Sequence, residues 1–390
     1  MFVRKRQIIL AVRGITMALC CHTIRTNQRD QMPKMDLPPR LPLSPGMLIS
    51  RVALIGGIIL IVAIGFAYAG GWLSPNRLGP GRIVAALSNR GGDPLGHRRN
   101  HAKGVCFIGS FQANGAGVAY STASMLKAGS YPVVGRFAIA VGDPDASDLM
   151  GRVESMAIRI TAPNGEEWRS GMNNSPVFIV STPAEFYELT RTQEVDPKTG
   201  KPDPAATAHF FATHPNSQAF AYWAKTAPWT GSWVDETYNS LDTFRFIDAQ
   251  GHSHLVRWSM VPAAALVPVS HAALKAEGPD FLVKDLTRRI AQGPLIWHLI
   301  ITLAAPGDPS NDATIAWPAD RSHVDVGTLM VTQVIPEANG PCRDYNYDPT
   351  ILPAGIKISD DPLLPARSAA YAKSFDLRTA EAADYPRHPQ

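Results

Sequence analysis

Apolar and polar residues alternate along several short segments in the C-terminal three-quarters of the chain. Residues 133–141 (VVGRFAIAV) and 155–161 (SMAIRIT) show this pattern. A period of two is typical of strands that bury one face. Gly251 lies in a turn between two further segments, which indicates a hairpin. About seven short strands at such spacing favour an antiparallel barrel or sandwich. The other predicted strands are residues 176–181, 243–247, 254–260, 297–303 and 328–335.

Helices are predicted between the strands. Thr182-Pro183-Ala184-Glu185 has the form of a capping box with proline at the first helical position. Residues 205–227, interrupted at Pro215, and residues 279–292 are further candidates, and residues 366–378 (ARSAAYAKSFDLR) also read as helix. The predicted fold class is therefore α+β around an antiparallel sheet.

One long apolar stretch, residues 52–73, carries no charge. Its length suffices to cross a hydrocarbon core of about 30 Å as a helix. Lys34, Arg40 and Arg51 precede it, and no basic residue follows until Arg77. The positive-inside rule therefore predicts a single-pass protein of the bacterial inner membrane with its N-terminus in the cytoplasm and its main domain in the periplasm.

The chain is accordingly divided into five regions. Residues 1–51 form a basic cytoplasmic segment, although Met35 or Met47 would give a more ordinary start. Residues 52–73 form the anchor, and Ala67-Tyr68-Ala69 resembles a signal-peptidase site, so cleavage is the alternative to an uncleaved anchor. The remaining regions are a Gly- and Pro-rich linker (74–94), a globular domain (95–380) and a tail (381–390).

The distribution of charges and the positions of cysteine and histidine residues bear on nucleic-acid binding, disulfide formation and metal binding. Residues 1–51 hold nine Lys and Arg against two Asp and Glu, a balance of +7, so the rest of the chain, at −3, is not a basic nucleic-acid binder. Cys106 and Cys342 lie in the exported part, where a disulfide can form, but the sequence does not say whether they meet. His97 and His101 are spaced for a shared metal, although no third ligand is evident.

Arg367 and Tyr371 are the most informative pair of residues. They lie four apart in a predicted helix, so both side chains emerge from one face. A guanidinium beside a tyrosine oxygen favours the phenolate over the phenol. A phenolate binds ferric iron, and tyrosine is a known axial ligand of haem. Alone, such a pair is more often a packed, solvated helix face.

Four segments, in order, resemble the haem catalases, and most closely the small catalase-related peroxidases. The match covers residues 95–380 and lacks the long arm and the C-terminal domains of larger catalases, so their tetramer is not implied, although a homo-oligomer stays open. The segments are RRNHAKG (98–104) followed by GSF (109–111), Arg136-Phe137 followed by Gly142, NNSPVF (173–178), and DPT…GI…SDDP…RSAAY (348–371).

The resemblance implies a catalase-type antiparallel β-barrel that binds haem b. Tyr371 would be the proximal iron ligand, and Arg367 would hold it as phenolate. His101 would take a proton from one peroxide oxygen and return it to the other, because imidazole can both accept and donate near neutral pH. Asn173 would donate a hydrogen bond to the bound peroxide.

The resemblance assigns four more residues to the haem itself. Phe178 would pack on the porphyrin face. Arg98, Arg136 and Arg378 would pair with the propionates, because buried carboxylates need cationic partners. Taken singly, each of these is more often a core or surface residue.

One position departs from the family pattern. The family's Arg-Phe-Ser triplet is Arg136-Phe137-Ala138 here, so the serine hydroxyl that orients the distal histidine is missing at this position. Its loss is expected to weaken the proton shuttle, and disproportionation more than oxidation of another donor, unless another group replaces the hydroxyl.

Three functions remain in competition on the sequence. The leading one is an exported, membrane-anchored haem peroxidase that reduces hydrogen peroxide or small organic hydroperoxides with an unidentified electron donor and keeps some catalase activity. A lyase or isomerase of lipid hydroperoxides on the same scaffold is the second. A haem-binding module without turnover is the third, and retention of His101, Asn173 and the Arg367–Tyr371 pair argues against it.

Overall fold

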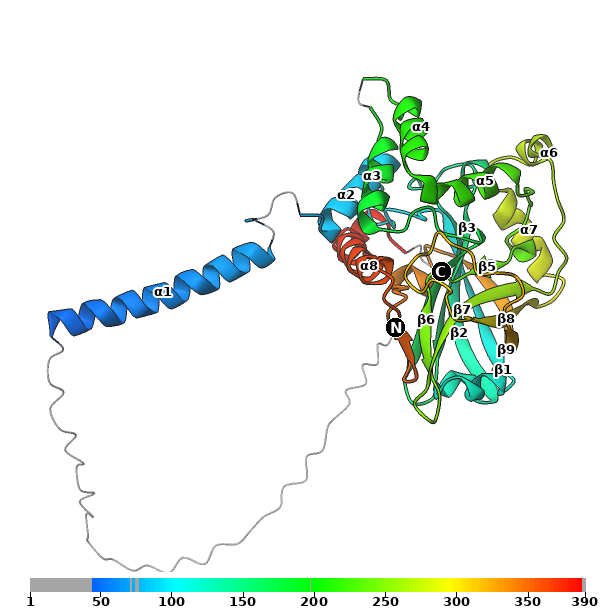
Figure 1. Ribbon diagram of the computed structural model, residues 1–390. Coiled ribbons are helices and arrows are strands. Elements are labelled where there is room, and N and C mark those ends of the chain that lie inside the picture. Colours follow the sequence, from blue (N-terminus) through cyan, green and yellow to red (C-terminus); the bar gives the residue numbers. More distant parts are fainter. Residues whose placement is uncertain (1–43, 71, 74–76, 197, 388–390) are drawn as a thin grey trace, which may run out of the picture. The chain divides into compact units, whose positions relative to one another are not determined.

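The computed structural model describes residues 44–70, 72–73, 77–196 and 198–387. The chain divides into two compact units, Met1–Leu73 and Ser74–Gln390. Figure 1 traces the chain from the first unit to the second. Most of the basic segment predicted for residues 1–51, and the end of the predicted tail, lie outside the described residues.

The first unit contains one long helix, α1 (Pro45–Ala69). The Ser44 hydroxyl caps its start by accepting a hydrogen bond from the Met47 amide at 3.3 Å, and the helix ends at Gly70. At 1.5 Å per residue, its 25 residues extend about 37 Å. The helix is long and apolar enough to cross a membrane, by length and composition, which makes it a candidate span that overlaps the predicted residues 52–73.

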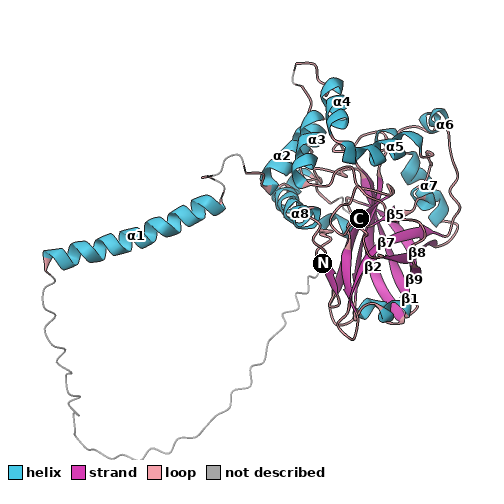
Figure 2. Cartoon of the chain, viewed as in Figure 1, coloured by secondary structure: helices cyan, strands magenta, loops and turns pink. Residues whose placement is uncertain are grey.

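The second unit is built on a closed antiparallel barrel (Figure 2). Eight strands follow one another around it in the order β7-β5-β4-β3-β2-β1-β9-β8, and pairing of β7 with β8 closes the ring. Closure decides between the two predicted architectures in favour of the barrel. The strands are β1 (Gly104–Ala113), β2 (Gly129–Ile139), β3 (Glu154–Thr161), β4 (Glu167–Asn173), β5 (Tyr238–Asn239), β7 (Ser253–Pro262), β8 (Leu295–Leu303) and β9 (His323–Pro336). The short strands β6 (Phe244–Ile247) and β10 (Ile356–Ile358) extend the sheet beyond β7.

Alternation along the strands fills the barrel with large side chains. Every second residue of β3 and of β8 is buried, as their apolar periodicity predicts. Phe137 from β2 stands among aromatic rings, with its centroid 4.7 Å from that of Phe107 and 5.5 Å from that of Trp297. Trp168 and Trp258 meet edge to face at 5.1 Å. Such aromatic contacts stabilise beyond the area that they bury.

Helices surround the barrel, with α2, α3 and α8 grouped together and α6 and α7 elsewhere (Figures 1 and 2). The capping box at Thr182 and Glu185 is confirmed, and so is the interruption at Pro215. The α-helices are α2 (Pro80–Gly91), α3 (Pro183–Thr192), α4 (Pro204–Thr213), α5 (Gln218–Thr226), α6 (His271–Ala276), α7 (Phe281–Ile290) and α8 (Leu363–Ala380). Short 3₁₀ helices lie at Ala116–Ala119, Ser124–Leu126, Asp148–Met150, Pro215–Ser217, Trp233–Asp235, Pro341–Asp344 and Ala382–Asp384.

Two sequence predictions about the barrel domain are wrong. Residues 176–181 do not form a strand; they are irregular, and Val177 and Val180 are buried without a sheet partner. Residues 74–94 are not wholly linker, because α2 occupies Pro80–Gly91 and buries Ile83, Val84 and Leu87 against α8 and α3. Its glycine and proline residues, which suggested a linker, lie at the two ends of the helix.

Candidate functional site

Two rows of residues cross strands β1 to β4 on the outer face of the barrel. Residues opposite one another in adjacent antiparallel strands share a face. The two rows are two residues apart along each strand, which is about 7 Å. The Asn173 row consists of Gly104, Ala138, Ser155 and Asn173, and the Gly171 row consists of Cys106, Arg136, Ala157 and Gly171.

A cavity of about 850 Å³ lies against this face. Helices α2, α3 and α8 contribute residues to its other walls. The structure therefore brings together in one cavity all eight residues that the sequence singled out. These are Arg98, His101, Arg136, Asn173, Phe178, Arg367, Tyr371 and Arg378.

His101 lies on the Asn173 side of the cavity, just before β1. Its backbone is left-handed, with φ of 54°, a conformation that costs energy in a non-glycine residue and is common at functional sites. Burial, reinforced by Arg136 and Arg90, lowers the pKa of His101 from 6.5 to about 3. The imidazole is therefore neutral near pH 7 and can accept a proton.

A hydroxyl holds the His101 ring although Ala138 has none. Ser155 Oγ lies 3.0 Å from His101 Nδ1 and 3.3 Å from the carbonyl oxygen of Ala138. The structure favours the alternative left open for Ala138, that another group replaces the hydroxyl, because Ser155, the partner of Ala138 on β3, supplies one. In the sequence, Ser155 is only a polar residue in an alternating strand. The strand register, which places Ser155 beside His101, cannot be derived from that pattern.

Tyr371 and Arg367 lie on the Gly171 side, on helix α8. Arg367 Nη2 donates to Tyr371 Oη at 3.4 Å and to the Gly171 carbonyl at 3.1 Å. Arg367 Nη1 donates to Asp242, a buried carboxylate that the sequence analysis missed. Burial alone would lower the pKa of Arg367, but Asp242 and Tyr371 raise it, so the guanidinium stays charged beside the phenol.

Glycine at position 171 leaves room for this pair. A Cβ there would stand 3.3 Å from both Tyr371 Oη and Arg367 Nη2. The site residues on α8 thus approach the barrel where it carries no side chain.

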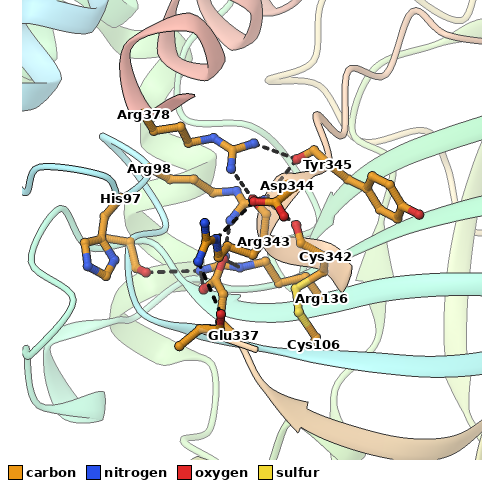
Figure 3. Close-up of polar contacts among 12 residues, drawn as sticks. His97, Arg98, Cys106, Arg136, Glu337, Cys342, Arg343, Asp344, Tyr345 and Arg378 are labelled. Carbon is orange, nitrogen blue, oxygen red and sulfur yellow. Dashed lines mark hydrogen bonds and ion pairs between the residues drawn. A yellow bond between two sulfur atoms is a disulfide. The ribbon is translucent and has the colours of Figure 1, made fainter. Parts of the chain in front are cut away.

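Three buried or half-buried arginines gather at one edge of the cavity (Figure 3). Arg136 donates to both carboxylate oxygens of Glu337, at 2.8 and 2.6 Å, and Arg98 also donates to Glu337. Burial alone would raise the pKa of Glu337, but Arg136 and Arg98 lower it to about 2. Arg378 donates only to backbone carbonyls among the described residues, including that of Tyr345 at 2.7 Å. Two of these three arginines share the carboxylate of Glu337, and none of the three has another ion pair in the part of the chain that the structure describes, so the site favours anions.

The segment that carries Glu337 is fixed by a disulfide. Cys106 of β1 and Cys342 are bonded, which settles the pairing that the sequence left open. The carbonyl oxygen of Cys342 accepts a hydrogen bond from Arg98 Nη2 at 2.9 Å. The bridge therefore ties the arginine cluster to the barrel (Figure 3).

Phe178 lines the cavity from the irregular segment after β4. Its amide donates to the Ala313 carbonyl at 2.8 Å, and its ring stacks on Phe186 of α3 at 6.0 Å. No group of three or more His, Cys, Asp and Glu among the described residues is arranged to hold a metal ion, so the spacing of His97 and His101 does not indicate such a site.

The residues present fit a haem. The phenol and guanidinium lie at the Gly171 row, and the imidazole and amide lie at the Asn173 row, along the same cavity. The cations at the edge suit two carboxylates. A closed antiparallel barrel with such a cavity on its outer face indicates a haem-binding protein.

The comparisons with known proteins agree with that class. The chain belongs to the catalase family, whose model matches residues 89–385. A catalase-related peroxidase of Synechococcus elongatus is 37% identical over 82% of this chain and 94% of that protein. A second one, from Mycolicibacterium paratuberculosis, is 30% identical over 77% of this chain and 95% of that protein. Membership in this family implies a haem cofactor.

Larger catalases share the fold over part of their length. A solved fungal catalase and a bacterial one each superpose with a TM-score of 0.67, at 20% and 22% identity. The superposition covers 76% and 78% of this chain but 62% of each catalase. Mouse catalase, at 26% identity, is likewise matched over 54% of its length.

Proposed function

We propose that this protein is a haem b peroxidase that reduces hydrogen peroxide or small organic hydroperoxides with an external electron donor and retains some catalase activity. The comparisons support a peroxide oxidoreductase, because the two relatives matched over nearly their whole length are named catalase-related peroxidases. The observation that carries the proposal is the cavity in which the Arg367–Tyr371 pair faces His101 and Asn173.

In this proposal Tyr371 would hold the iron, and Arg367 would keep the ligand oxygen ionised. The contact of 3.4 Å between Arg367 Nη2 and Tyr371 Oη places the guanidinium beside the ligand oxygen, as that role requires. Arg98, Arg136 and Arg378 would hold the propionates at the edge, and Phe178 would pack on a ring face. When bound, the haem iron supplies the redox chemistry at which the O–O bond is broken.

His101 and Asn173 handle the peroxide on the other side. The neutral His101 imidazole takes a proton from one peroxide oxygen at Nε2, while Nδ1 stays bonded to Ser155 Oγ. The same Nε2 returns the proton to the second oxygen, which leaves as water. The Asn173 amide donates a hydrogen bond to the peroxide and cannot compete for its proton.

Location and partners complete the proposal. Helix α1 anchors the protein once in a bacterial inner membrane, and the barrel domain faces the periplasm. A disulfide in that domain agrees with an oxidising compartment. The electron donor is a small molecule or protein of that compartment, and a homo-oligomer is compatible with this arrangement. Neither the lyase nor the non-catalytic module is favoured by any contact in the cavity.

An absorption spectrum of the purified protein with its bound pigment tests the proposal. A ferric phenolate spectrum that changes on addition of peroxide, together with oxidation of an added donor, is expected. Tyr371→Phe should lose the phenolate spectrum and the activity, whereas Tyr222→Phe, at a tyrosine that is 72% exposed, should change neither. A colourless protein that takes up no haem, or a Tyr371→Phe variant with an unchanged iron spectrum, contradicts the proposal.

A further inference from the structure

Ser155 and Ala138 face each other directly across strands β3 and β2. The Cβ atoms of such a pair lie about 5 Å apart on the same face of the sheet. A hydroxyl on either residue can therefore reach the same position above this face of the sheet. In this chain that position is taken by Ser155 Oγ, 3.0 Å from His101 Nδ1.

We propose that Ser155 is the positioning residue of the distal imidazole, and that it performs from β3 the task of the hydroxyl absent at Ala138. This inference rests on the proposed function and specifies how its proton shuttle is held. It also removes the reason to expect weakened disproportionation, because the Nδ1 partner is present at the neighbouring position.

The second contact of the hydroxyl fixes the direction of the hydrogen bonds. A serine hydroxyl donates once and accepts twice. Because the Ala138 carbonyl, 3.3 Å away, can only accept, it takes the Ser155 proton, and Oγ then accepts from His101 Nδ1–H. Nε2 is left as the bare, basic nitrogen. When Nε2 gains a proton, the bond from Nδ1–H to Oγ is unchanged, so the ring does not have to turn between the two steps.

The same row also places the amide of the site. Ser155 pairs with Ala138 on one side and with Asn173 on the other. The residue that orients the imidazole is therefore the strand neighbour of the residue proposed to bind peroxide. This geometry selects the tautomer that carries its proton on Nδ1. The strand register also sets the distance between Ser155 and Asn173.

A side-chain exchange across the two strands tests the inference in the full-length haem protein. Ser155→Ala is expected to slow the spectral reaction of haem with hydrogen peroxide by about 10- to 100-fold, the usual effect of losing such a support. Haem content should be unchanged. The double variant Ala138→Ser, Ser155→Ala returns the hydroxyl from the other strand and should recover the rate to within about threefold. Ser155→Thr, which keeps the hydroxyl, should also stay near the wild type.

A ring-nitrogen NMR measurement provides a readout that needs no turnover. The His101 signal, assigned by its absence in His101→Gln, should show the Nδ1–H tautomer in the wild type and in the double variant, and lose it in Ser155→Ala. An unchanged tautomer and rate in Ser155→Ala overturn the inference, as does a correctly folded double variant that stays as slow as the single one. A wild type that ignores peroxide overturns the proposed function instead, and the tautomer then decides on Ser155 alone.

Discussion

At the scale of single residues, burial sets the protonation state on which the chemistry depends. The His101 imidazole is enclosed, and the nearest charges are guanidinium groups, so the added proton is disfavoured twice. A histidine in water is half protonated near pH 6.5. In this protein nearly all of the His101 imidazole is neutral, and therefore basic, well below pH 7.

The pH dependence of the peroxide reaction should report this shift. Because protonation removes the base only as pH falls toward 3, the pKa of His101, kcat/KM for peroxide is expected to be flat from about pH 5 to about pH 8 and to fall below about pH 4. Steady-state rates across this range provide the measurement. A tenfold loss between about pH 7.5 and about pH 5.5 would show that His101 titrates as an ordinary histidine.

A second prediction at the scale of single residues concerns Gly171, which has no side chain to fill the space beside Tyr371 and Arg367. In Gly171→Ala, the new methyl group would stand 3.3 Å from both Tyr371 Oη and Arg367 Nη2, closer than most Cβ contacts, so one of them must move. Haem affinity is expected to fall by about tenfold, with a shifted ferric spectrum, since small displacements of a ligand or its support are costly.

Gly81→Ala is the matched control, because its Cβ would meet nothing within 4 Å. It should leave haem titration and spectrum as they are. Equal behaviour of the two variants would mean that the Tyr371 side of the cavity tolerates the methyl group, and that the close approach has no role.

At the scale of elements, the segment between β9 and α8 organises the cation cluster. Its backbone carbonyls accept from Arg98 and Arg378, and its buried carboxylate Glu337 binds Arg98 and Arg136. Breaking a buried ion pair on one side leaves uncompensated charge and destabilises strongly.

The contribution of Glu337 to the stability of the haem-free protein should decrease in acid. Its pKa lies at about 2 in the folded chain against an ordinary 4.5, so the ionised carboxylate stabilises the fold above about pH 4.5 and this stabilisation is lost as pH falls toward 2. The difference corresponds to about 3 kcal/mol of unfolding free energy. Urea unfolding of wild type and Glu337→Gln at about pH 6 and about pH 3 is the measurement, and the gap between them should shrink in acid.

Glu277→Gln, at an exposed carboxylate, is the control and should follow the wild type at both pH values. A Glu337→Gln variant as stable as the wild type at about pH 6 would exclude the ion pairs with Arg98 and Arg136 as a source of stability.

Individual elements also show how much of the fold could be predicted from the sequence. Strands β3 and β8 were predictable because one face packs into the barrel and the period of two is unbroken. Strand β1 was missed because Gly104 and Gly109 interrupt its pattern where other backbone comes close, and residues 176–181 were mistaken for a strand because they are apolar without belonging to the sheet.

The candidate site divides in the same way. The eight residues within the family motifs meet in one cavity, as the resemblance implied. Ser155, Asp242 and Glu337 were missed, since each acts through a neighbour that only the register or the tertiary fold supplies. A strand register is set by long-range pairing, which a local pattern does not contain.

At the scale of the whole molecule, an apolar helix and a barrel domain form two units of one chain. Under the proposed topology the full chain should remain with the membrane after carbonate washing, and a chain beginning at residue 77 should be soluble with an unchanged haem spectrum. Membrane fractionation with immunodetection provides the measurement. A mass that begins after residue 69 would show that the helix is removed, and a full-length chain released by carbonate would exclude the anchor.

Under the proposed periplasmic location, the Cys106–Cys342 bond has a consequence for the order of events during export. Its two sulfurs are 236 positions apart, and the second comes from residue 342 of 390. No oxidant can join them until nearly the whole polypeptide has passed through the translocation pore. A chain stalled on its way across therefore has Cys106 and Cys342 as free thiols in addition to Cys20 and Cys21, and alkylation of Cys342 would count the molecules whose passage is unfinished.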